Sequence, residues 1–151
     1  MTATLRPTTE LVAVAWIGGI QGLSPGMVAT QLPKDNTTWA ASGFVTVRTV
    51  GGAPGMYVPL RQPVVAVDAW AVNPTSNKPP WFQANGLMEL IDQGCRVSNA
   101  GRWLTLPGLY LQARVATAYW VTEPQRVYTD QGGYARYTAN LALNWVPAVS
   151  L

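Results

Sequence analysis

Residues 64–72 read Val-Val-Ala-Val-Asp-Ala-Trp-Ala-Val, and this stretch decides the fold of the chain. Successive side chains of a β-strand point to opposite faces of a sheet. Both alternating sets are apolar here, and Asp68 is the only charged residue in the stretch. Two apolar faces are typical of a strand that is covered on both sides. The stretch therefore predicts a central strand of a sheet.

The sequence before this strand predicts further extended segments. Residues 44–50 are rich in β-branched side chains, which favour a strand. Residues 51–55 contain three glycines and a proline, which indicate a turn or a projecting loop. We expect a short strand over residues 58–62 that ends before Pro63. Residues 28–32 predict one more short extended piece.

The C-terminal part of the sequence predicts a long β-hairpin. Residues 134–146 alternate between apolar and polar side chains, as does a strand with one buried face. Residues 111–121 predict its partner strand, because the odd-numbered positions are mostly apolar and would form the buried face. These positions are Leu111, Ala113, Val115, Tyr119 and Val121. Residues 122–133 connect the two strands, and Pro147 is expected to end the second.

Residues 9–23 predict a helix that is apolar on both sides. Thr8 or Thr9 can cap its start, and Glu10 suits the positive end of the helix dipole. A helix with two apolar sides requires cover on both. It is either buried within its own domain or held between its own sheet and a neighbouring subunit.

Residues 81–98 predict a second, amphipathic helix. Its apolar stripe recurs at intervals of three and four residues. The stripe consists of Ala84, Leu87, Met88, Ile91, Gly94 and Cys95. Asp92 and Arg96 lie one turn apart and form an acid-first pair. Because Cys95 belongs to the stripe, we expect an inert, buried thiol.

The order of these elements defines a fold class. The length of 151 residues is typical of one domain, so residues 1–151 form a single unit. A helix, strands, a second helix and further strands follow one another. This order predicts an α+β fold, with two α-helices packed on one face of a mainly antiparallel β-sheet and a long C-terminal β-hairpin.

Charged residues are unusually few. Ten Lys and Arg and seven Asp and Glu make up 11% of the chain, against about 25% in a typical soluble domain. The formal net charge is +3, and the basic residues are scattered, which is weak support for nucleic-acid binding. A free domain normally keeps a well-charged surface. We therefore expect neighbouring subunits to cover much of this surface.

The composition excludes several kinds of chemistry. The chain has no histidine and one cysteine, which rules out His-based metal sites, Ser–His dyads and internal disulfides. No apolar run reaches the roughly 18 residues of a membrane span. Asp68 is the one acid in an apolar strand, and we expect it to pair with an arginine such as Arg48, Arg61 or Arg114 rather than to act in catalysis. We expect no enzymatic activity, no metal and no cofactor.

Four segments, in this order, carry a resemblance to a known family. They are Thr30-Gln31-Leu32-Pro33, Phe44-Val45-Thr46-Val47-Arg48-Thr49-Val50-Gly51-Gly52, Pro63-Val64-Val65-Ala66-Val67-Asp68-Ala69-Trp70 and Arg136-Tyr137-Thr138-Ala139-Asn140-Leu141-Ala142-Leu143. Over roughly residues 9–146 the chain resembles the tail terminator, or tail completion, proteins of long-tailed siphophages, especially those infecting actinobacteria.

The resemblance implies a structural virion protein assembled in the host cytoplasm. Its subunits would form a homo-oligomeric, hexameric ring that caps the tail tube, terminates tail polymerisation and joins the tail to the head-side neck. The implied partners are the tail-tube protein and a head-side neck or stopper protein, with non-specific passage of DNA through the lumen and no membrane. The alternatives are another neck component, such as a head–tail stopper or tail-tube protein, and a small-molecule-binding α+β domain whose tryptophans line a pocket.

The family has no catalytic motif, so the candidate residues are contacts. The glycine-rich residues 51–57 and the connection over residues 123–133 would contact the tube or the neck. Four arginines would be lumen or inter-subunit charges, or else ordinary solvated surface residues. The interface candidates are Arg48, Gly51, Gly52, Met56, Tyr57, Arg61, Arg126 and Arg136.

Overall fold

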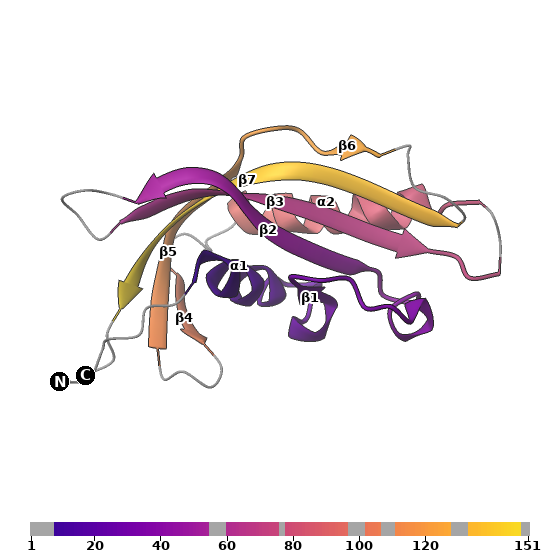
Figure 1. Cartoon of the computed structure of the whole chain (residues 1–151), viewed down its shortest axis with the longest axis horizontal. Coiled ribbons are helices and arrows are strands. Elements are labelled where there is room, and N and C mark those ends of the chain that lie inside the picture. The colour runs from indigo at the N-terminus through magenta and orange to yellow at the C-terminus, as the bar shows by residue number, and fades with distance from the viewer. Residues whose placement is uncertain are drawn as a thin grey trace.

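The computed structural model of the chain describes residues 8–54, 60–75, 78–96, 102–106, 111–127 and 133–148 (Figure 1). These residues form one sheet, two α-helices and two short 3-10 turns. The helices are α1 (Thr9–Gly18) and α2 (Trp81–Arg96), and the turns are Pro25–Met27 and Asn36–Thr38. The strands are β1 (Val28–Ala29), β2 (Phe44–Pro54), β3 (Arg61–Val72), β4 (Arg102–Leu106), β5 (Leu111–Trp120), β6 (Gln125–Arg126) and β7 (Tyr134–Ala148).

Strand β3 lies in the middle of the sheet, as predicted from its two apolar faces. The strand order is β1-β2-β3-β7-β5-β4, and β6 pairs with β7 beside this path. Among the described residues all pairs are antiparallel except β1 with β2. Strands β5 and β7 form the expected C-terminal hairpin. The α+β prediction is confirmed.

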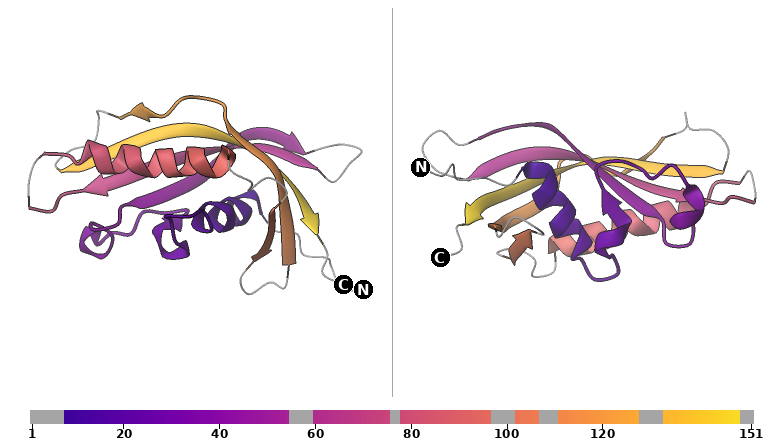
Figure 2. Two further views of the ribbon diagram at one scale, coloured as in Figure 1. Left: turned by 180° about the vertical axis from the view of Figure 1, so that it is seen from behind. Right: turned by 60° about the horizontal axis from the view of Figure 1, so that its bottom comes forward.

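Both helices lie on the same face of the sheet, which Figure 2 shows from two further directions. Trp16 and Ile17 of α1 share one buried cluster with Met88 of α2 and with Val65 and Val67 of β3. All five are at most 1% exposed. Each such side chain contributes about 1.5–3 kcal/mol when it leaves water, so this layer supplies much of the driving force for the fold.

Helix α1 begins as predicted but ends earlier. Thr8 Oγ1 accepts a hydrogen bond from the Leu11 N–H at 3.2 Å, which caps the first turn. The helix ends at Gly18 rather than residue 23. Beyond it the chain turns, and Ile20 packs against α2 at Gly94, where a Cβ atom would lie 2.7 Å from Ile20 Cδ1. Instead of continuing as a helix, the chain turns after Gly18, and Ile20 packs between the two helices.

The predicted loop over residues 51–55 is wrong for its first part, because β2 continues through Gly51 and Gly52 to residue 54. A bulge at Val50 shifts the pairing with β3. Gly52 then adopts φ +88°, and a Cβ atom there would meet Gln62 O and lie 2.6 Å from Pro63 Cα. The glycines therefore serve a close pairing of two strands rather than a free turn.

Two prolines lie within strands that were expected to stop beside them. Pro63 pairs with Gly52 on β2, whereas the pairing of β3 with β7 passes from Arg61 to Val64 and omits it. Proline has no N–H to donate, which accounts for the omission. Pro147 lies in β7 opposite β5. Strand β4 was not predicted, because its five residues give too short a pattern.

Candidate interaction surface

Within the described part of the chain, no helix covers the other face of the sheet. Val45, Val47 and Val65 are buried beneath the helices, so the residues between them point to the opposite side. We call this side of β2, β3, β7 and β5 the uncovered face. The side chains that lie on the uncovered face include Thr46, Arg48, Asp68, Trp70, Tyr119 and Arg136.

The segment before β2 covers one end of the uncovered face. Trp39 packs against Phe44 and Val72 in a small buried cluster. Its ring centroid lies 6.2 Å from that of Phe44 and 6.1 Å from that of Tyr134. Asn36 Nδ2 donates a hydrogen bond to the Tyr134 hydroxyl at 3.2 Å. The open part of the face therefore begins beside Trp70.

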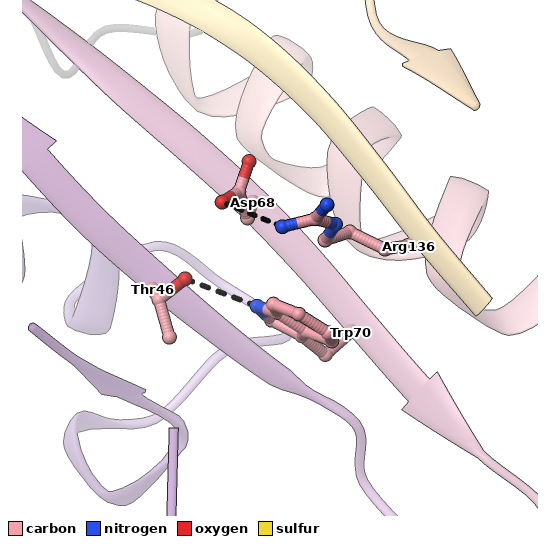
Figure 3. A network of polar contacts seen from close by, with 4 residues as sticks. All are labelled: Thr46, Asp68, Trp70 and Arg136. Atoms are coloured by element: carbon pink, nitrogen blue, oxygen red, sulfur yellow. Dashed lines mark hydrogen bonds and ion pairs between the residues drawn. The ribbon is translucent and has the colours of Figure 1, made fainter. Parts of the chain in front are cut away.

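A polar cluster holds the centre of the uncovered face (Figure 3). Trp70 Nε1 donates to Thr46 Oγ1 at 3.0 Å, which ties β3 to β2. The Arg136 guanidinium lies 4.8 Å from the Trp70 ring centroid, and its Nη1 lies 3.8 Å from Asp68 Oδ2. The side chains of Arg136 and Asp68 are 25% and 24% exposed. The predicted arginine partner of Asp68 is confirmed, but it is Arg136 rather than one of the arginines named from the sequence, Arg48, Arg61 or Arg114.

The four candidate arginines are not gathered in one site. Arg48 is exposed on the uncovered face, which also holds Arg136. Arg61 lies on the helix-covered side, with its guanidinium 5.6 Å from the Trp145 ring centroid. Arg126 of β6 stacks 4.9 Å from the Trp81 ring centroid, and its Nε donates to the Tyr137 hydroxyl at 3.0 Å.

The remaining candidates divide between a strand and the undescribed part of the chain. Gly51 and Gly52 belong to β2, as described above. Met56 and Tyr57 lie outside the described residues. The connection over residues 123–133 contains the short strand β6, and its residues 128–132 also lie outside the described part.

The interface candidates named from the sequence do not include the apolar side chains that are exposed in the structure. Tyr119 and Val121 were expected to be buried, but they are 54% and 52% exposed. A bulge between Val115 and Thr117 reverses the inward and outward order of β5, which turns Ala118 and Trp120 toward the core. Val50 on β2, Trp103 on β4 and Phe82 on α2 are also exposed. The sequence carries no signal for the bulge.

The tryptophans do not line a common pocket. Trp16 and Trp145 are in the main core, and Trp39 is in the smaller cluster. The others lie at separate places: Trp70 on the uncovered face, Trp81 at the start of α2, Trp103 exposed on β4 and Trp120 at the end of β5. The separate positions of the seven tryptophans give no support to the alternative of a tryptophan-lined ligand pocket.

An acidic groove lies between α2 and the end of β5. It has a volume of about 580 Å³ and carries the carboxylates of Glu89, Asp92 and Glu123. Asp92 Oδ2 pairs with Arg96 Nε at 3.0 Å, as the sequence predicted. Tyr119 and Trp120 form part of the opposite wall. We call this hollow the acidic groove.

Cys95 borders the acidic groove, where its thiol is half-buried. Burial, followed by the nearby charge of Asp92, raises the pKa of the Cys95 thiol from 9.0 to about 11. Because the thiolate is the reactive form, iodoacetamide at pH 8 should label Cys95 roughly 100-fold more slowly than the unfolded chain in urea. Equal labelling rates, measured by mass spectrometry, would contradict the assignment.

The same shift sets the direction of a pH effect on stability. Below pH 9 the thiol is neutral in both states, and the raised pKa has no cost. Above pH 9 the unfolded chain loses its proton first, so the free energy of unfolding should fall until the pH passes about 11. A Cys95→Ala variant should show a smaller fall over this interval in urea titrations.

The described residues hold no group of three or more Cys, Asp or Glu side chains placed to bind a metal ion. None of the helices described is both long and apolar enough to span a membrane.

Comparisons with known proteins yield a likeness of fold only. No protein-family model matches the chain, and no curated protein matches it in sequence. One solved structure that is similar to it is described as the "Virion of native gene transfer agent (GTA) particle". The superposition covers 95% of this chain and 89% of that chain, with a TM-score of 0.48 and 13% sequence identity.

Proposed function

We propose that this chain is a structural virion protein that forms a ring, caps a phage tail tube, terminates tail polymerisation and joins the tail to the head-side neck. The observation that carries the proposal is the uncovered face. Val50 of β2 and Tyr119 of β5 are 47% and 54% exposed on its strands, and Trp103 of the neighbouring β4 is 58% exposed. Permanent subunit interfaces are large and apolar, and exposed apolar surface of this kind marks interaction sites.

The charge distribution supports the same proposal. Only 11% of the residues are charged, so much of the surface lacks the charges that keep a free domain soluble. Arg136 and Asp68 largely compensate each other at the centre of the uncovered face. A face that combines exposed apolar side chains with paired and exposed charges suits contact with copies of itself or with other virion proteins.

The proposal is tested first on the purified protein. Native mass spectrometry and negative-stain electron microscopy should show a closed ring, with a hexamer as the expected stoichiometry. A protein that stays monomeric at all concentrations would contradict ring formation.

Its place in the virion is tested by deleting the gene from the phage that carries it. Loss of a terminator should give overlong tails or tails without heads, and complementation with the intact gene should restore normal particles. Tails of normal length that fail to join heads would instead assign the chain to a stopper-like neck component. Normal, joined particles would contradict the proposal.

A further inference from the structure

An arm of the sheet projects beyond the helices. It consists of residues 48–54 of β2 paired with residues 61–66 of β3. Val65 at its base lies beneath the helices, and its far end extends past β5 at the left of Figure 1. The only charges in the sequence between residues 44 and 67 are Arg48 and Arg61, so the arm is basic. Arg48 is exposed, and Val50 beside it is 47% exposed.

The outer edge of the arm has no strand partner among the described residues. Strand β1 pairs with β2 only at Val45 and Thr46. Glu10 of α1 accepts the Thr49 N–H at 3.4 Å, which occupies one further position. Beyond Thr49 the edge of β2 offers its peptide groups for a new strand pairing.

A second open strand edge borders the acidic groove. In the described part of the chain β4 pairs with β5 only as far as Val115. The Val121 N–H bonds to Asn140 O of β7, and the peptide groups of a strand alternate in direction. The peptide groups of Ala118 and Trp120 therefore point away from β7. The groove combines this edge with the carboxylates of Glu89, Asp92 and Glu123.

We infer that the basic arm of one copy docks along the acidic groove of a second copy. The edge of β2 would extend the partner's sheet beside β5, which is the β-augmentation mode of recognition. Arg48 would then face the carboxylates of Glu89 and Glu123, and Val50 would cover the exposed ring of Tyr119. This inference rests on the proposed function, because it specifies the contact that joins neighbouring subunits.

The arm and the groove are different surfaces of the same chain, so the contact is heterologous. Each copy offers an arm to one neighbour and a groove to another. Repetition of such a contact closes into a ring when the rotation between subunits divides a full turn. The described charges favour the basic arm of a second copy as the occupant of the acidic groove. The groove carries three acids and the single base Arg96, which is paired with Asp92.

The test uses charge reversal on the full chain. One variant carries Glu89→Lys with Glu123→Lys, a second carries Arg48→Glu, and a third carries all three substitutions. The first two should raise the concentration for half-assembly at least about tenfold, because like charges then meet at each contact. The third variant should assemble like the unaltered protein. Mixing the first two should also restore assembly, because every contact then joins opposite charges.

A matched control separates the contact from a general effect of charge. Lys34→Glu makes the same change in net charge as Arg48→Glu at an exposed position outside the arm, and it should assemble normally. Circular dichroism and thermal melting establish that each variant is folded before native mass spectrometry is applied.

The outcomes of the two proposals are distinguishable. Suppose that the unaltered protein forms rings. If the charge-reversed variants then assemble equally well, the arm-and-groove contact is overturned and the ring remains. The same conclusion follows if those variants lose assembly and neither the combined variant nor the mixture restores it. If the unaltered protein never assembles, the proposed function is overturned as well. Rescue in both the combined variant and the mixture supports the contact.

Discussion

Replacing Trp145 by alanine is expected to lower the free energy of unfolding by about 3–5 kcal/mol. Trp145 is 0% exposed and is one of the two largest fully buried side chains. It lies on β7 opposite Arg61 of β3 and Val115 of β5, so its ring fills the core where the two halves of the sheet meet. The loss would be measured by urea denaturation followed by tryptophan fluorescence and circular dichroism.

Trp103→Ala provides the matched control for this substitution. Trp103 is 58% exposed on β4, and its removal should change the free energy of unfolding by less than about 1 kcal/mol. Similar losses for the two variants would mean that the core is not centred on Trp145. The comparison also separates burial from the loss of an aromatic ring as such.

Arg136→Glu is expected to cost about 2 kcal/mol of folding stability. The substitution removes the cation that lies over Trp70 and places a second carboxylate beside Asp68 on a half-buried surface. Adding Asp68→Arg should recover part of the loss, because opposite charges then face each other again. Thermal melting of the single and double variants measures this coupling.

Arg48→Glu is the control for Arg136→Glu. Arg48 lies on the same face but is exposed, so its reversal should change the stability of the subunit by no more than about 0.5 kcal/mol. Equal losses at the two positions would contradict a structural role for the Arg136 cluster. Because its contacts also stabilise the subunit, Arg136 is a poor position at which to probe assembly by charge reversal.

The elements that the sequence predicted well are those with a complete pattern. Residues 64–72 show two apolar faces over a whole strand, and they form the centre of the sheet. The stripe of α2 extends over about three turns, and all of its members but the half-buried Cys95 are buried. Local patterns of this length outweigh the competing signals of single residues.

The errors arise where one residue or one distant pairing decides the outcome. Pro63 and Pro147 were expected to end strands, but each occupies a position that the sheet tolerates without its N–H donor. The bulge near Ala116 reverses the exposure of Tyr119 and Val121. Such irregularities depend on the register with other strands, which a local pattern does not contain.

The candidate surface was predictable only in part. The sequence indicated that Asp68 would have an arginine partner, but Arg136 was identified only by the register of β3 with β7, in which it lies opposite Trp70. The acidic groove joins residues of α2 to Glu123, which is far along the chain from Glu89. Both features depend on long-range pairing rather than on spacing in the sequence.

The position of β7 also bears on how the chain acquires its fold. This strand is the last to be synthesised, yet it lies between β3 and β5 and connects the β1-β2-β3 part of the sheet to the β5-β4 part. Until it emerges from the ribosome, β3 and β5 each lack their common neighbour, and the core has no Trp145. Pairings between such distant segments are formed slowly. Nascent chains should therefore remain incompletely folded until residues 134–148 have left the ribosome.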